Sequence, residues 1–297
     1  MQSCEATGRR RVLQAKSARA DVCCGEGFMA VSKRRRIDTA LITGASSGIG
    51  EALARRFARG GHALVLVARN NARLDALASA LRAEHGIKVW VQASDLTQPG
   101  AIRALAVALK RRRVEVDVLV NNAGVLQQGP FTSISARRHQ ELIELNVAGV
   151  TAMLAQFLPP MCARGRGRVL NVASIAAFQP VPMLATYAAT KAFVLSLTES
   201  LAEELKDSGV TVTALCPGIT ATHMLSSAVE SNSRLVRLPG LLIGDADQVA
   251  EEGYRACAEG DVICVPGAVN QAVTLASRAT PKWLLRRITG SLVRRGV

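Results

Sequence analysis

Two side chains four residues apart, Tyr187 and Lys191, form the clearest chemical pattern in this chain. On a helix, four residues make about one turn, so both side chains project from the same face. A free tyrosine titrates near pH ~10, which makes it a poor proton donor or acceptor at neutral pH. A lysine cation beside the phenol favours the phenolate and lowers the tyrosine pKa toward neutrality, where acid–base catalysis is efficient. The pair therefore predicts proton transfer by Tyr187.

Ser174 adds a hydroxyl upstream of this pair. It follows the apolar run of residues 169–173, which is typical of a buried strand. A hydroxyl at the end of such a strand can hydrogen-bond to a substrate oxygen. Taken alone, the Tyr–Lys spacing also fits a helix with an ordinary tyrosine and a solvated lysine, because this spacing often arises by chance. The rest of the chain bears on the choice between the two interpretations.

A glycine-rich turn lies near residue 45. It follows the predicted buried strand of residues 39–43 and precedes an amphipathic helix with Leu53, Ala54 and Phe57 on its inner side. Glycines there permit a tight turn and let the backbone approach a pyrophosphate, which then lies against the positive end of the helix. The turn contains Gly44, Ser46, Ser47, Gly48, Ile49 and Gly50.

Strand-like and helix-like patterns alternate from residue 37 onward. The predicted strands are residues 39–43, 63–67, 88–92, 116–120, 169–173, 210–215 and 262–265. A long helix through Asn146 is expected to stop at Pro159, and a helix over residues 185–208 carries Tyr187. This alternation predicts an α/β fold in which a parallel sheet is covered on both faces. No internal repeat or interdomain linker is evident, so a single domain is expected.

Further short motifs follow the glycine turn. They are Asn-Asn-Ala-Gly at 121–124, Asn146, Ser174, the Tyr187 and Lys191 pair, and Pro217-Gly218. In this order and at these spacings, together with the glycine turn, they resemble the short-chain dehydrogenase/reductase family over residues 37–270. The resemblance implies a doubly wound parallel sheet (a Rossmann fold), hydride transfer with a nicotinamide cofactor, and assembly as a homodimer or homotetramer.

The resemblance also assigns cofactor contacts. It places Asp95 at the adenine amine, residues 121–124 under the adenosine, Thr222 near the carboxamide and Lys191 at the nicotinamide ribose. In chain order, the expected cofactor contacts are Gly44, Ser46, Ser47, Gly48, Ile49, Gly50, Arg69, Asp95, Asn121, Ala123, Gly124, Tyr187, Lys191, Pro217, Gly218 and Thr222.

The catalytic set implied by the resemblance is Asn146, Ser174, Tyr187 and Lys191. In the reductive direction a carbonyl carbon receives hydride, Tyr187 gives a proton to the carbonyl oxygen, and Ser174 binds that oxygen. Asn146 would order a water beside Lys191 that relays protons to solvent. The simpler interpretation of Asn146 is a buried asparagine that caps an irregularity in a helix.

The end of the second strand indicates which dinucleotide binds. A carboxylate there would hydrogen-bond to the ribose hydroxyls and repel a 2′-phosphate, but the position holds Ala68. Arg69 follows at once, and a guanidinium suits bidentate phosphate binding. Ser46 can add a hydroxyl. We therefore expect NADP(H) as the cofactor; the alternative is that Arg69 is a solvated loop arginine.

Two other functions remain open at this stage. A non-catalytic NADPH sensor of the same fold would bind the cofactor without turnover. A sugar-nucleotide epimerase or dehydratase of the extended branch shares the Tyr–Lys spacing, but usually has a different glycine pattern and a longer C-terminal domain. The substrate is expected to be an apolar carbonyl or alcohol, such as a lipid, steroid, retinoid or aromatic ketone, because residues 175–184 and 223–242 are largely apolar.

The net charge of +14 belongs to the two ends of the chain. Residues 1–36 carry nine Lys and Arg against three acids, and residues 278–297 carry six against none. Aromatic residues make up only 3% and are not interleaved with basic ones, so no specific nucleic-acid binding is expected. Seven scattered cysteines and four dispersed histidines indicate reduced thiols, a cytoplasmic setting and no metal site.

The two ends are expected to lie outside the catalytic domain. Residues 1–36 have the composition of a disordered basic extension without a signal-peptide core, and a chain that starts at Met29 is expected to fold and work normally. Two long uncharged runs, residues 145–163 and 169–190, are near membrane-spanning length. Both contain asparagine, glutamine and proline, so they are poor candidates for membrane spans.

Residues 271–297 form a basic tail whose last part, residues 281–297, has an amphipathic pattern. Leu284, Leu285, Ile288 and Leu292 share a stripe on a helix, with Arg286, Arg287 and Arg294 opposite, Trp283 near the basic side and Arg295 beside the stripe. Such a helix can lie on an anionic membrane as a peripheral contact, or pack on the fold or on a second subunit.

Overall fold

The predicted strands form one sheet of seven parallel strands in the computed structural model, which describes residues 37–220 and 244–294. The strands are β1 (Thr39–Thr43), β2 (Ala63–Ala68), β3 (Val89–Ala93), β4 (Val118–Asn121), β5 (Gly167–Val172), β6 (Val210–Leu215) and β7 (Ile263–Cys264). Most bounds differ from the predicted ones by one or two residues; β1 and β6 match them, and Ser174 lies two residues beyond the end of β5.

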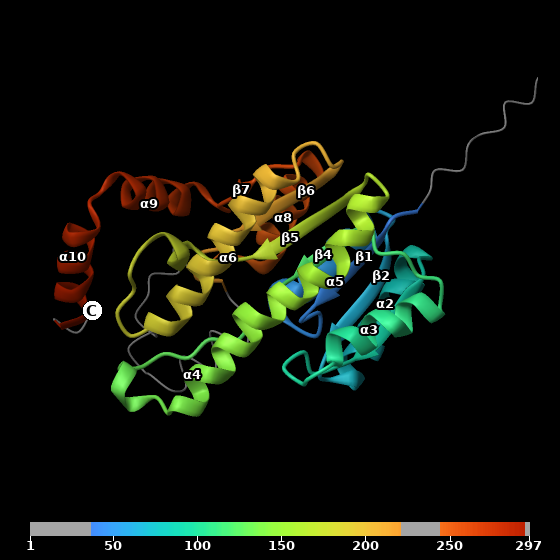
Figure 1. Cartoon of the computed structure of the whole chain (residues 1–297), viewed down its shortest axis with the longest axis horizontal. Coiled ribbons are helices and arrows are strands. Elements are labelled where there is room, and N and C mark those ends of the chain that lie inside the picture. Colours follow the sequence, from blue (N-terminus) through green and yellow to red (C-terminus); the bar gives the residue numbers. More distant parts are fainter. Residues whose placement is uncertain (1–36, 221–243, 295–297) are drawn as a thin grey trace, which may run out of the picture. The chain divides into compact units, whose positions relative to one another are not determined.

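The strand order is β3-β2-β1-β4-β5-β6-β7 (Figure 1). From β1 the chain first builds toward one edge of the sheet, then returns to the other side of β1 at β4, and Leu41 is paired with both Val65 and Leu119. In doubly wound sheets, ligands bind outside the carboxyl ends of the strands where the order reverses. This places the expected binding crevice between β1 and β4.

Helices cover both faces of the sheet. On one face the core joins α1 (Gly48–Arg59), α2 (Asn71–His85) and α8 (Ala246–Glu259) to the strands. On the other face it joins α3 (Ala101–Arg111), α5 (Val150–Ala163) and α6 (Ala185–Glu204). The predicted inner residues Leu53, Ala54 and Phe57 of α1 are buried. The fold is therefore the doubly wound α/β class that the alternation predicts.

The prediction that the long helix stops at Pro159 is wrong, because α5 continues to Ala163 with Pro159 and Pro160 inside it. Each proline lacks the N–H that would bond to the carbonyl four residues earlier. Those carbonyls belong to Ala155 and Gln156, which are exposed along with the prolines, so water can satisfy them. Buried apolar side chains on the opposite side, such as Met161, hold the turn against the sheet.

The helical run of residues 136–163 consists of α4 (Ala136–Ile143), a π-helical segment η2 (Glu144–Gly149) and α5. By length and composition it is apolar enough to cross a membrane, because the mean hydropathy of an 18-residue window within it is 1.4. In this fold α5 packs on the sheet and contributes six buried residues to the core. Its apolar character is accounted for by that packing.

The remaining described elements are two 3-10 turns and two C-terminal helices. The turns are η1 (Phe131–Ser133) and η3 (Ile175–Phe178), and the helices are α9 (Ala268–Ala279) and α10 (Lys282–Arg294). The catalytic helix α6 ends at Glu204, four residues before the predicted end, and a turn leads to Gly209 at φ +73°. Residues 1–36, the expected cofactor contact Thr222, the expected pocket segment 223–242 and Arg295 lie outside the described residues.

Candidate active site

The predicted site residues gather at one edge of the sheet because each follows the carboxyl end of a parallel strand. Gly44 follows β1, Arg69 follows β2, Asp95 comes shortly after β3, Ser174 after β5 and Pro217 after β6. Tyr187 and Lys191 come to the same edge from the first turns of α6, which packs against β5, β6 and η3. The structure therefore brings together predicted residues that are up to 173 positions apart in the sequence.

The glycine turn has the backbone that a phosphate cradle needs. Gly44 and Gly48 adopt φ of +66° and +58°, in the left-handed region that favours glycine. A Cβ on Gly50 would lie 2.2 Å from the Gly44 carbonyl oxygen, so only glycine lets α1 approach the turn this closely. Ser47 caps α1 without a side-chain hydrogen bond to the helix. The positive end of α1 is thus available to an anion.

Thr43, which received no role from the sequence, and Asn122, which the resemblance placed under the adenosine, hold this turn against β4. The Thr43 hydroxyl donates to the Val120 carbonyl and accepts from the backbone N–H groups of Asn122 and Ala123, both at 3.0 Å. The Asn122 amide donates to the carbonyls of Thr43 at 2.9 Å and Gly44 at 3.3 Å. Both residues lie in or beside predicted motifs, but the sequence alone does not show that their side chains point toward each other.

Asn121 uses its side chain inside the fold. Its amide donates to Asn171 at 2.9 Å, and the Asn171 amide donates to the Thr198 hydroxyl at 3.0 Å. All three are buried, and they join β4, β5 and α6. The side chain of Asn121 thus supports the position of the catalytic helix.

Asp95 and Arg69 flank the crevice on the β2 and β3 side. Asp95 accepts from the Thr97 backbone at 3.0 Å and from the Thr97 hydroxyl at 2.7 Å, and these bonds, with a smaller contribution from Arg69, hold the pKa of Asp95 below its ordinary value. The Asp95 carboxylate is therefore fixed and ionised. Arg69 is exposed at the end of β2.

Ser174, Tyr187 and Lys191 form the centre of the site. Ser174 is buried and begins η3, where its hydroxyl accepts from the Ala176 backbone at 3.1 Å. The Lys191 ammonium donates to the Val172 carbonyl at 2.8 Å and lies 5.8 Å from the centre of the Tyr187 ring. Burial lowers the pKa of Lys191 from 10.5 to about 8. The predicted one-turn pairing of the phenol and the ammonium is therefore present.

The expected lowering of the Tyr187 pKa is wrong for this structure. Burial of the phenol raises its pKa above 10.0, and a hydrogen bond with the Ser174 side chain offsets this only in part. Keeping the Tyr187 phenolate away from water costs more free energy here than its neighbours supply by stabilising the charge. Lys191 does not make up the difference, because it is itself desolvated and bonds to a backbone carbonyl. Tyr187 is therefore protonated at neutral pH, as a proton donor must be.

Asn146 lies in the π-helical segment η2 and is almost fully buried. Its side chain accepts from the Val125 backbone N–H and donates to the Val125 carbonyl, both at 2.9 Å, and donates to the Thr190 hydroxyl at 3.2 Å. A Cβ on Gly124 would lie 3.2 Å from the side-chain amide oxygen of Asn146 and 3.6 Å from the side-chain nitrogen of Lys191. A side chain at position 124 would therefore crowd Asn146 and Lys191.

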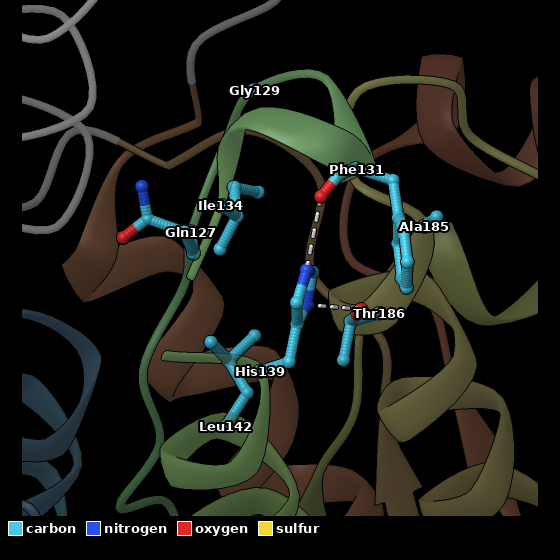
Figure 2. Close-up of a pocket in the computed structure, with 8 residues that line it drawn as sticks. All are labelled: Gln127, Gly129, Phe131, Ile134, His139, Leu142, Ala185 and Thr186. Carbon is cyan, nitrogen blue, oxygen red and sulfur yellow. Dashed lines mark hydrogen bonds between the residues drawn. The ribbon is translucent and has the colours of Figure 1, made fainter. Parts of the chain in front are cut away.

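A second cluster fixes the start of the catalytic helix from the α4 side (Figure 2). The His139 ring stacks on Phe131 and contacts its carbonyl through Nε2 at 3.2 Å and the Thr186 hydroxyl through Nδ1 at 2.8 Å. A carbonyl only accepts, so Nε2 carries the proton and a neutral ring accepts from Thr186 at Nδ1. Thr186 directly precedes Tyr187, so this bond reaches the residue next to the proton donor.

The sequence profile of short chain dehydrogenases matches residues 38–233, which is well over half of the chain and spans the whole glycine turn, the Tyr–Lys pair and the Pro-Gly turn. The chain belongs to the short-chain dehydrogenase family. It is accordingly a nicotinamide-dependent oxidoreductase, as the geometry of the site indicates. The resemblance inferred from the motifs is confirmed.

Three similar proteins illustrate the match. The oxidoreductase UcpA of Escherichia coli is 37% identical over 196 residues, which cover 66% of this chain and 74% of that protein. A short-chain dehydrogenase from Sphingobium yanoikuyae in complex with NADPH is 36% identical with a TM-score of 0.72, over 82% of this chain and 96% of that one. The bulky-bulky ketone specific alcohol dehydrogenase from Comamonas testosteroni is 32% identical with a TM-score of 0.69, over 83% and 96% respectively.

The described residues contain no group of three or more His, Cys, Asp or Glu side chains placed to hold a metal ion. Besides Asp95 and Arg69, the polar groups at the crevice are hydroxyls, amides and a lysine, which suit hydrogen bonding to a dinucleotide and to a substrate oxygen.

Proposed function

We propose that this chain reduces an apolar ketone or aldehyde with NADPH and catalyses the reverse oxidation with NADP. The observation that carries the proposal is the arrangement of the half-buried Tyr187 with the buried Ser174 and Lys191 at the carboxyl edge of the sheet. When bound, the nicotinamide supplies hydride to the carbonyl carbon. Tyr187 donates its proton to the carbonyl oxygen, which the Ser174 hydroxyl holds in place, so that the products are the alcohol and the Tyr187 phenolate.

Lys191 stabilises this phenolate. Its ammonium lies close to the ring and its pKa of about 8 allows it to hold or to pass on a proton near neutrality. Gly124 adds no side chain beside Asn146 and the Lys191 nitrogen, so a water held there can return a proton to Tyr187. Each element of the expected catalytic set therefore has a place in the cycle.

The preference for NADP(H) rests on the end of β2. Ala68 provides no carboxylate to repel a 2′-phosphate, and the exposed Arg69 guanidinium can bind one. The NADPH bound to the Sphingobium yanoikuyae relative supports the same choice. An apolar substrate is supported by η3, where Ile175, Ala176, Ala177 and Phe178 follow Ser174, and by the bulky ketones that the Comamonas testosteroni relative takes.

The test is NADPH oxidation with a panel of apolar ketones and aldehydes. The Tyr187→Phe variant removes only the proton donor, so we expect turnover to fall at least about 100-fold, since general acid catalysis contributes on that order. NADPH binding, followed by fluorescence, should persist. A Tyr187→Phe variant with near wild-type turnover would contradict the mechanism. Tight NADPH binding without turnover on any carbonyl would favour the cofactor sensor instead.

A further inference from the structure

Helix α9 buries polar side chains and exposes apolar ones, which is the reverse of a helix that packs on a hydrophobic core. Its inner side consists of polar residues, with Thr274 and Ser277 only 6% and 7% exposed. Its outer side is apolar, with Val269, Val273 and Leu275 exposed by 48%, 46% and 72%. The alanines at 268, 272 and 276 are exposed beside them. We call these six residues the outer face of α9; an apolar face of this kind is normally covered by a partner.

The exposed apolar side chains continue into α10, where Trp283 is 54% exposed and Leu284 is 36% exposed. Figure 1 shows α9 and α10 at one edge of the domain. The segment after Asp261 contains no acidic residue, and its exposed basic side chains include Arg278, Arg286 and Arg287; the Glu252 carboxylate of α8 accepts from the Gly267 N–H at the start of α9. An apolar strip bordered by arginines and a tryptophan has the composition of a helix pair that lies in a membrane interface.

The inner side of α9 lies against the active-site turns. It packs on η3, the turn that begins at Ser174, and Arg278 of α9 lies 5.9 Å from the Phe178 ring of η3. At its other end, Asn270 is so close to Gly218 that a Cβ there would lie 2.6 Å from the amide oxygen. A surface that docks through the outer face of α9 would therefore lie one helix away from the turn that holds the substrate oxygen.

We propose that α9 and α10 form a docking surface for an anionic lipid membrane, which would supply the apolar substrate of the proposed reaction from the bilayer. Val269, Val273 and Leu275 enter the interface, and the basic residues bind lipid phosphates and carboxylates. A second copy of this chain is the other candidate occupant. Symmetric pairing through the same face would place two acid-free basic segments in one interface, and their repulsion favours the membrane.

The experiment measures flotation of the full chain with vesicles of phosphatidylcholine alone or mixed with phosphatidylserine, at low and high salt. We expect binding to the mixed vesicles that weakens with salt. The double variant V273E/L275E should lose about tenfold or more of this binding, because two carboxylates then enter an anionic interface. The single variant Val273→Glu should lose part of this binding, and Val107→Glu is its matched control, since Val107 is 43% exposed on α3, away from this face.

Charge is tested by Arg287→Glu, with Arg103→Glu on α3 as a control of equal charge change. Arg287→Glu should weaken vesicle binding, and Arg103→Glu should not. Equal flotation of V273E/L275E and wild type would overturn the proposal. A second result would also overturn it: light scattering shows an oligomer for the wild type and a monomer for V273E/L275E, and neither protein binds vesicles. The outer face of α9 would then be a subunit contact.

Vesicle binding requires no catalysis, so its outcome is separate from that of the proposed function. NADPH oxidation with a water-soluble ketone, measured on the same variants, should be unchanged. Binding without turnover would support the docking surface and contradict the proposed reaction, whereas turnover without binding would contradict only the docking surface.

Discussion

Lys191 is a cationic side chain that is 6% exposed, and its burial makes a prediction about stability. Its pKa is about 8 in the folded chain against 10.5 for an ordinary lysine. Between these values the unfolded chain binds a proton that the folded chain has released, so the contribution of Lys191 to the free energy of unfolding rises with pH. The full rise is on the order of 3 kcal/mol.

The measurement is denaturant unfolding of wild type and Lys191→Met from about pH 7 to about pH 10. Relative to the variant, the wild type should become more stable as pH rises through this window. Tyr187 and Cys216, whose pKa values are raised by burial, titrate in both proteins and largely cancel in the difference. Two stability profiles that stay parallel would show that Lys191 keeps its proton in the folded chain.

Arg69 carries the prediction on cofactor choice. Arg69→Asp replaces a phosphate-binding cation with a carboxylate that accepts from ribose hydroxyls and repels the 2′-phosphate. A charge-assisted hydrogen bond is worth about 1.5 to 3 kcal/mol, so the ratio of kcat/KM for NADPH over NADH should fall about 10- to 100-fold. Arg73→Asp, an exposed position in the first turn of α2, is the control of equal charge. An unchanged ratio would assign the choice to another residue.

At the residue scale, the sequence predicted which groups meet but not the environment they meet in. The one-turn spacing of Tyr187 and Lys191 gave the pairing, because helix geometry fixes it. The direction of the Tyr187 pKa depends on burial of the phenol in the folded chain, which local spacing does not show. The hydrogen bonds between Thr43 and Asn122 were not predicted for the same reason, since they follow from the contact between two parallel strands.

At the scale of elements, strands were predicted well because a fully buried parallel strand is a continuous apolar run between turn signals. The failures were local. Pro159 was expected to end a helix, yet the helix continues because its freed carbonyls face water. The π-helical segment at Asn146 has no local signal; it becomes evident only when the Asn146 side chain is seen bonded to Val125 and Thr190.

The link between α4 and α6 supports an element-scale prediction. His139→Leu removes the bond to Thr186, so the first turn of α6 is held less firmly beside Ser174. We expect kcat to fall about tenfold with little change in the KM for NADPH, because small displacements of a catalytic group are costly. His139→Gln should restore most of the loss, since its amide can donate to the Phe131 carbonyl and accept from Thr186.

Thr186→Val completes the test of this link. If the bond acts as one unit, the double variant H139L/T186V should be no slower than either single variant. Thr186→Ser retains the hydroxyl and is the control. Fully additive losses, or a loss of stability with kcat preserved, would show that His139 only packs the pocket in Figure 2.

For the molecule as a whole, the last prediction concerns where the fold begins. Within the residues that the structure describes, the two core clusters run from Ala40 to Cys257. The site residues begin at Gly44. A chain that starts at Met29 keeps all of these described core and site residues, and it should match the full chain in Tm, in NADPH affinity and in turnover. The comparison is made by thermal unfolding of the two chains, with and without cofactor, and by NADPH oxidation. If the shorter chain has a Tm lower by several degrees, residues 1–28 stabilise the fold. In a chain of this size such a shift corresponds to a loss on the order of 1 to 2 kcal/mol in the free energy of unfolding.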